Sequence, residues 1–172
     1  MSLARARLQE ERKAWRKDHP HGFVAKPMSN TDGTQDLLHW SFIIPAKRDS
    51  VFSPAELSGM LTFTEDYPHF PPAARFDKID GEAPFHPNIF PDGKVCLSII
   101  NPPESRHAYG KGGTWTPALN VKHVLLALQK SLDEATGYAA GREEAYRLYN
   151  NDRNAYNARV KRQVAKRMEA LR

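Results

Sequence analysis

Prolines crowd the middle of this chain and leave little room there for regular structure. Eight of the 13 prolines fall in one stretch, at Pro68, Pro71, Pro72, Pro84, Pro87, Pro91, Pro102 and Pro103. Proline lacks a backbone N–H and interrupts both helix interiors and central strands. We therefore expect residues 77–119 to be mostly irregular. A loop region of this length in a compact domain is often functional.

The residues before this stretch carry the patterns of one helix and several strands. Residues 2–17 predict a helix with Ser2 as its cap and Ala4, Leu8 and Trp15 on one apolar stripe. Strands are expected at 23–25, 37–44, 57–63 and 74–76, with a hairpin turn at 30–33. Alternation in the second strand places Leu38, Trp40, Phe42 and Ile44 on one face, and Leu37, His39, Ser41 and Ile43 on the other.

Helical periodicity returns after the proline-rich stretch. Asn120 is the expected cap of a helix whose apolar positions are Val121, Val124, Leu125, Leu128 and Leu132. A short helix is expected around Ala145, Leu148 and Tyr149, and a last helix places Tyr156, Val160, Val164, Met168 and Leu171 on one stripe. The chain is thus predicted to be a single α+β domain, residues 1–172. Its order is an N-terminal helix, a four-stranded antiparallel meander sheet, an active-site loop and C-terminal helices.

The charge balance favours acidic partners. The formal net charge is +5 and the pI about 9.4, and the basic residues gather near the two ends of the chain. Solvated helix faces are the simpler interpretation of each basic run. Nucleic acid is one possible acidic partner, but no recognition motif is present, so we expect no specific binding to nucleic acid. No apolar run is long enough to cross a bilayer, so no membrane association is predicted.

The chain has one cysteine, Cys96, which excludes an intrachain disulfide and favours a reducing compartment, the nucleus and cytoplasm. Its neighbours Asn88, Pro91 and Gly93 suit neither helix nor strand interiors, which places the thiol on an ordered loop. A thiol there can hold an acyl group as a thioester until an amine attacks it. The Asn88 amide can then stabilise the oxyanion. The simpler alternatives are a buried structural cysteine and a turn-forming asparagine.

The histidines give weaker signals. His86 lies near Cys96 in sequence and suggests a Cys–His dyad, but nothing in the sequence brings its ring within hydrogen-bonding reach of the sulfur. His19 and His21 suggest a metal site only faintly, because no further ligands cluster with them. No metal ligand is therefore predicted.

Several separated motifs resemble the conjugating enzymes of the ubiquitin-like cascade. They are YPHFPP at 67–72, FHPN at 85–88, GKVCL at 93–97 and WTP at 115–117. Three further segments are most similar to the SUMO-type members of that family: ERKAWRKDHP at 11–20, GFVA at 22–25 and CLSI at 96–99. The resemblance runs from about Leu8 to the C-terminal helix.

This resemblance implies an activity, a site and partners. Cys96, in a shallow groove, would receive a modifier, most closely SUMO, from a heterodimeric activating enzyme and pass it to lysines of protein substrates, with Asn88 as the oxyanion donor. The activating enzyme would use the ATP, so no cofactor is expected here. SUMO ligases would assist a monomeric enzyme. The basic residues that would bind modifier and activating enzyme are Arg12, Lys13, Arg16, Lys17 and His19.

The groove departs from the family pattern at several positions. Phe90 stands where the family has Tyr, and Ala139 lies near the position of an Asp. These two family residues help to desolvate and deprotonate the incoming lysine, so Asp92 or Asp133 is a hypothetical replacement for the missing carboxylate.

The residues that recognise an acidic group near the target lysine also differ. The family lysine is replaced by Ala73, and a family threonine by Lys94. We expect Arg75 and Lys94 to carry out this recognition. Two insertions, at 78–83 and 101–113, are further departures from the family pattern.

Two alternatives to a SUMO-type enzyme remain open at this point. One is a conjugating enzyme for ubiquitin or another ubiquitin-like protein. The other is a binding module of the same fold that transfers nothing, although the presence of Cys96 speaks against it.

Overall fold

Four antiparallel strands form the sheet at the centre of the molecule. The computed structural model describes residues 1–105, 112–137 and 141–172. The strands lie in the order β1-β2-β3-β4, with bounds β1 Val24–Ser29, β2 Gln35–Pro45, β3 Glu56–Thr62 and β4 Ala73–Phe76. The predicted antiparallel meander is confirmed, although β1 is longer than the sequence pattern indicated.

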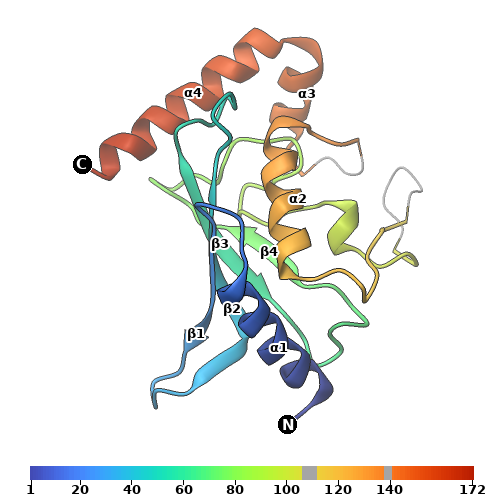
Figure 1. Ribbon diagram of the computed structural model, residues 1–172. Helices are drawn as coiled ribbons and strands as arrows, with labels where there is room; N and C mark the ends of the chain where they lie inside the picture. Colours follow the sequence, from blue (N-terminus) through green and yellow to red (C-terminus); the bar gives the residue numbers. More distant parts are fainter. Residues whose placement is uncertain (106–111, 138–140) are drawn as a thin grey trace.

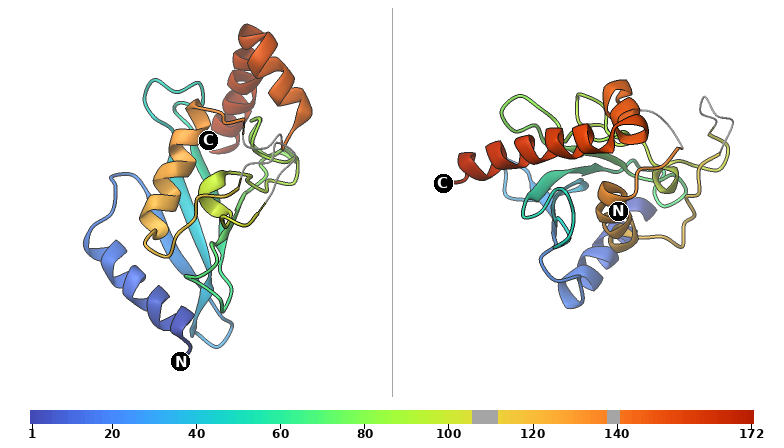
Figure 2. Two further views of the ribbon diagram at one scale, coloured as in Figure 1. Left: turned by 90° about the vertical axis from the view of Figure 1, so that its right-hand side faces the viewer. Right: turned by 90° about the horizontal axis from the view of Figure 1, so that it is seen from above.

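Helices lie at both ends of the sheet and across it. They are α1 Leu3–Lys17, α2 Val121–Asp133, α3 Glu143–Asn151 and α4 Arg153–Ala170, with a short 3-10 turn, η1, at Ser98–Ile100. Figure 1 shows α1 at one end of the sheet, α2 crossing it, and α3 and α4 at the opposite end; the views in Figure 2 agree. The predicted α+β arrangement is therefore confirmed. No helix within the described residues is long and apolar enough to span a membrane.

Two predicted helix caps are present. The Ser2 hydroxyl accepts a hydrogen bond from the backbone N–H of Arg5 at 3.2 Å. Asn120 accepts from the N–H of His123 at 3.0 Å, and His123 Nδ1 accepts from the N–H of Asn120 at 3.2 Å. Such reciprocal bonds satisfy two of the backbone donors that a helix start leaves unpaired.

A buried carboxylate that the sequence pattern did not reveal joins α1 to α2. Glu11 is 9% exposed, and its Oε1 accepts from the N–H of Val121 at 2.7 Å. Its Oε2 accepts from Arg7 Nε at 3.0 Å and from the hydroxyl of Tyr67. A buried carboxylate is stable only with such partners, so Glu11 holds α1 against the start of α2.

The predicted alternation along β2 is correct from Trp40 onward and wrong before it. Leu37 was expected on the face opposite Trp40, yet it is 6% exposed, whereas Leu38 is only partly buried. The cause is a bulge, because Met28 pairs with Asp36 while the preceding residue of β1 pairs with Trp40. A bulge breaks the two-residue period of side chains along a strand.

The stripe predicted for the last helix is mostly correct. Tyr156, Val160 and Val164 are buried, but Leu171 is 72% exposed and lies beyond the end of α4. Gln163 also lies on the buried face, at 4% exposed. It is kept there by hydrogen bonds rather than by apolar contact.

The insertion at 78–83 folds back on itself and packs against α4. Ile79 and Glu82 pair as an antiparallel bridge. Glu82 forms an ion pair with Arg159 of α4 at 2.9 Å. Gln163 Nε2 donates to the carbonyl of Ala83 at 2.7 Å, and the N–H of residue 85 donates to Gln163 Oε1 at 2.8 Å. These contacts hold the start of the loop that leads to the thiol.

Candidate functional site

A tight turn precedes Cys96. The N–H of Gly93 donates to the carbonyl of Phe90 at 2.8 Å, and the N–H of Phe90 donates to the carbonyl of Lys94 at 2.9 Å. Gly93 has a φ of +97°, and a Cβ at this position would lie 2.1 Å from the carbonyl oxygen of Phe76. Glycine is therefore required here both by conformation and by space.

The segment that carries the thiol lies between two other backbone segments. On one side the N–H of Val95 donates to the carbonyl of Ala74 in β4 at 3.0 Å. On the other side the N–H of Cys96 donates to the carbonyl of Asn88 at 2.9 Å. Lys94 and Val95 form antiparallel bridges with Arg75 and with residue 89, respectively. The backbone of the site is thus fixed by the edge of the sheet.

Cys96 is buried, like its neighbours on both sides. It is 7% exposed, and Val95 and Leu97, each 4% exposed, belong to the hydrophobic core. Partial burial raises the pKa of the Cys96 thiol, and the positive charge of Lys94 acts against that rise. The resting sulfur is consequently protonated for the most part at neutral pH.

An open pocket of about 230 Å³ begins directly after the thiol. One wall is the stretch 97–99, and the other is the last turns of α2 with the residues that follow it. Its lining is formed by Leu97, Ser98, Ile99, Ala127, Lys130, Ser131, Glu134 and Thr136. The pocket therefore lies next to Cys96 along the chain, between the segment that follows the thiol and the end of α2.

His86 has a structural role and does not act as a base for Cys96. It is 0% exposed, and its Nδ1 accepts from the N–H of Asn88 at 3.0 Å. Nε2 therefore carries the proton and donates to the carbonyl of Ser131 at 2.6 Å. Burial lowers the pKa of His86 to about 4. Both ring nitrogens are occupied, which excludes the Cys–His dyad in this conformation.

The Asn88 side chain bridges the active-site loop and the segment after α2. Its Nδ2 donates to the carbonyl of Thr136 at 3.0 Å, and its Oδ1 accepts from the N–H of Thr136 at 2.9 Å. The side chain is wholly buried. The turn-stabilising role of Asn88 is therefore present, and its role as oxyanion donor stays a prediction.

Three charged residues that the sequence analysis singled out meet beside the thiol. Arg75 Nη1 lies 2.8 Å from Asp92 Oδ2 and donates to the Asp92 carbonyl at 3.0 Å. The N–H of Lys94 donates to Asp92 Oδ1 at 3.0 Å. This hydrogen bond, followed by that from Arg75, lowers the pKa of Asp92. Asp92 therefore stays ionised and is a poor candidate for a general base. Phe90, half-buried, begins the same turn.

The other two groove residues do not join this cluster. Ala139 lies outside the described residues. Asp133 lines a different pocket, of about 330 Å³, together with Lys47, Tyr149 and Arg153. The hypothesis that Asp133 replaces the missing groove carboxylate therefore receives no support from its position.

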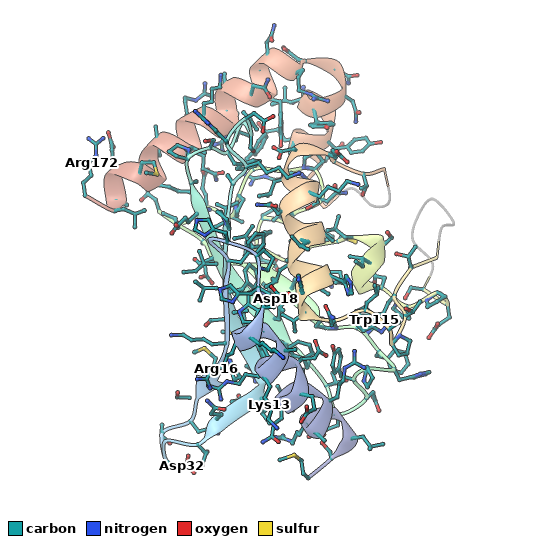
Figure 3. All side chains as sticks on the ribbon, in the orientation of Figure 1. Lys13, Arg16, Asp18, Asp32, Trp115 and Arg172 are labelled. Carbon is teal, nitrogen blue, oxygen red and sulfur yellow. The ribbon has the colours of Figure 1, made fainter. Side chains whose placement is uncertain are left out.

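The basic residues predicted on the first helix lie on its outer surface. Lys13 and Arg16, labelled in Figure 3, are exposed along with Lys17 and His19, and Arg12 is half-buried. His19 ends the group, with its Nδ1 donating to the carbonyl of Trp15 at 3.0 Å. Arg12, Lys13 and Arg16 also border a pocket of about 230 Å³ that reaches Gln35 of β2. Positive charge thus continues from α1 to the edge of the sheet.

Two partners at the site escaped the sequence analysis, Ser131 and Thr136. They act through backbone groups, which every residue type carries, so no side-chain signal could have identified them. Among the residues that the structure describes, no three His, Cys, Asp or Glu side chains gather in a way that could hold a metal ion.

Comparison with known proteins places this geometry in a family. Residues 7–164 match the family model described as "Ubiquitin-conjugating enzyme". The chain is 37% identical to the SUMO-conjugating enzyme UBC9 of Caenorhabditis elegans, covering 95% of this chain and 91% of the relative. It is 42% identical to the SUMO-conjugating enzyme SCE1 of Arabidopsis thaliana (94% and 92%) and 38% identical to the Sumo-conjugating enzyme ubc9 of Dictyostelium discoideum (94% and 93%). The chain therefore belongs to the ubiquitin-conjugating enzyme family.

Proposed function

We propose that this chain accepts a ubiquitin-like modifier, SUMO, as a thioester on Cys96 and transfers it to lysines of protein substrates. The observation that carries this proposal is the position of Cys96. The thiol lies on a backbone segment that is hydrogen-bonded to β4 on one side and to residue 88 on the other, and an open pocket begins at the next residue, Leu97. The names of three relatives at 37–42% identity support SUMO as the modifier.

The chemistry needs two acyl transfers at this sulfur. In the first, the Cys96 thiolate attacks the thioester that joins the modifier to its activating enzyme, and the enzyme's thiol leaves. In the second, a neutral lysine amine attacks the carbonyl carbon held on Cys96. A C–N bond forms, the C–S bond breaks, and the released thiolate of Cys96 takes up the proton that the amine loses. The activating enzyme uses the ATP, so neither transfer requires a cofactor bound to this chain.

Asn88 is the proposed donor to the oxyanion of the tetrahedral intermediate. Its amide is fixed by the backbone of Thr136, and its own carbonyl accepts from the N–H of Cys96. A donor held in this way loses little free energy in reorganisation during the reaction.

Two surfaces are proposed to bind partners. Arg75 and Lys94 recognise an acidic group near the target lysine, since both are exposed beside the thiol. The basic residues of α1 and just after it, namely Arg12, Lys13, Arg16, Lys17 and His19, bind the modifier and its heterodimeric activating enzyme. Complementary charge of this kind speeds encounter between proteins. SUMO ligases and a location in nucleus and cytoplasm belong to the same proposal.

The test is incubation of the chain with ATP, modifier and activating enzyme, followed by a non-reducing gel. With SUMO and its activating enzyme we expect an adduct that thiol reductant removes and that the Cys96→Ala variant lacks. Ubiquitin with its own activating enzyme should give little adduct. An adduct with ubiquitin alone would reassign the modifier. The absence of any reductant-sensitive adduct would contradict the proposal and favour a binding module without transfer activity.

A further inference from the structure

We propose that Lys94 is itself an acceptor for the acyl group carried on Cys96, so that the charged enzyme modifies itself within one molecule at this lysine. The inference rests on the proposed function, because the acyl group must first reach Cys96. It concerns a residue that is close to the thiol for reasons of backbone geometry alone.

The backbone places Lys94 and Cys96 on the same side. Residues 94 and 95 form antiparallel bridges to opposite sides, which keeps this segment extended. Side chains alternate along extended backbone, so the side chains of Lys94 and Cys96 leave the segment on one side and that of Val95 on the other. Lys94 is exposed, whereas Cys96 is 7% exposed and Val95 is 4% exposed.

The distance suits an attack by the lysine amine. Two residues of extended backbone separate the Cα atoms by about 6.6 Å, and the flexible four-carbon stem of lysine covers a comparable length. The effect of the Lys94 charge on the pKa of Cys96 is further evidence that the ammonium group lies near the sulfur. The amine can therefore meet a carbonyl carbon bonded to that sulfur without any change in the backbone.

The amine is also free of a fixed ionic partner. The nearest acid, Asp92, is paired with Arg75 at 2.8 Å, and it accepts only from the backbone N–H of Lys94. Within the described ranges, Lys94 Nζ takes part in no ion pair. No hydrogen bond or ion pair of Nζ within the described part of the chain therefore has to be broken before the amine can turn toward the sulfur.

The reaction balances without a further reagent. The lone pair of Lys94 Nζ attacks the modifier's C-terminal carbonyl, the C–N bond forms, and the C–S bond to Cys96 breaks. The proton lost by nitrogen goes to the sulfur through solvent. The product is an isopeptide on Lys94 with a free thiol at Cys96. A modifier attached to Lys94 would lie next to Cys96. Each self-modification would therefore slow later transfer by the same molecule.

The experiment follows a charged enzyme after the supply of modifier has been stopped. The chain is loaded with SUMO by its activating enzyme, Mg²⁺ is then removed with EDTA, and samples are run with and without thiol reductant. We expect a reductant-resistant adduct to grow as the thioester decays, with a rate constant independent of enzyme concentration. Peptide mapping should find the modifier's C-terminal remnant on Lys94.

Two lysine variants test whether Lys94 is the acceptor. In Lys94→Arg, which keeps the positive charge, the resistant adduct should form at least tenfold more slowly per mole of thioester. The matched control Lys161→Arg changes an exposed lysine on α4 and should form it at the rate of the wild-type chain. An equal rate in Lys94→Arg, or a rate that rises with enzyme concentration, would overturn the proposal.

A second arm separates this proposal from the proposed function. A synthetic peptide α-thioester ending in Gly-Gly exchanges with the Cys96 thiol and needs no activating enzyme. Acylation of Lys94 in the wild-type chain, but not in Cys96→Ala, would support the self-modification even if SUMO were the wrong modifier. Absence of acylated Lys94 in this arm would overturn it even if SUMO charging succeeded.

Discussion

The two parts of the loop that leads to Cys96 differ in how their polar groups are satisfied. In residues 85–89, His86 and Asn88 are wholly buried, and their side chains bond to backbone groups of α2 and of the segment after it. In the turn 90–94, Asp92 and Lys94 are exposed; Asp92 pairs with Arg75 of β4, and Lys94 faces solvent. Residues 85–89 thus hold the position of Cys96, whereas the turn 90–94 exposes charged groups that partners can contact.

This difference has a simple energetic origin. A buried donor or acceptor that loses its partner destabilises the fold by about 1–3 kcal/mol. An exposed ion pair contributes about 0–1 kcal/mol. Changes in residues 85–89 should therefore affect stability and transfer together, while changes in the turn should affect only the choice of target. Three experiments test this contrast.

Asn88→Ala should have the largest effect. We expect single-turnover transfer from the pre-charged variant to fall on the order of 100-fold, as for other lost oxyanion donors. The free energy of unfolding should also fall by about 1–3 kcal/mol, because the N–H and carbonyl of Thr136 lose their partner. Transfer is measured well below the melting temperature of the variant. A loss of stability with unchanged transfer would leave Asn88 a purely structural residue.

His86 should make stability depend on pH. The folded chain holds the pKa of His86 at about 4, whereas an unfolded histidine titrates near 6.5. The unfolded state therefore takes up the proton first, and stability is lost as pH falls from about 6.5 toward 4. Urea unfolding should show a decrease of about 2 kcal/mol between pH 7 and pH 5.

The variant His86→Gln should lack this part of the pH dependence, whatever its absolute stability. His21→Gln, which alters an exposed histidine, should retain it. Equal slopes for wild type and His86→Gln would show that His86 is not the group responsible.

Substitutions at the exposed turn should have the smallest effect, and they should change only the rate of transfer. Replacing both Arg75 and Lys94 by Ala should reduce transfer to substrates with an acidic residue near the target lysine by about tenfold, the factor given by 1.4 kcal/mol. Substrates without that residue serve as the control and should be transferred at equal rates. Unfolding by urea should change little. Transfer of the acidic substrates by the double variant at the wild-type rate would refute this recognition.

The order of elements and the loop that carries the thiol could be predicted from local sequence. Ser2 and Asn120 began their helices where they should, because a cap depends on local spacing. Pro91 and Gly93 predicted the turn before Cys96 for the same reason. The family motifs around Asn88 and Cys96, which lie within ten residues of each other along the chain, predicted the chemistry of the site.

The hydrogen bonds and ion pairs between distant segments could be identified only from the folded structure. Glu11 reaches Val121, and Asn88 reaches Thr136, across distances in sequence that no periodicity records. The bulge that buries Leu37 depends on how β1 pairs with β2. The pairing of Arg75 with Asp92, which leaves Lys94 without a partner among the described residues, is also a matter of neighbouring backbone segments. Local sequence sets backbone preference, but burial and charge pairing depend on contacts between segments far apart in the chain.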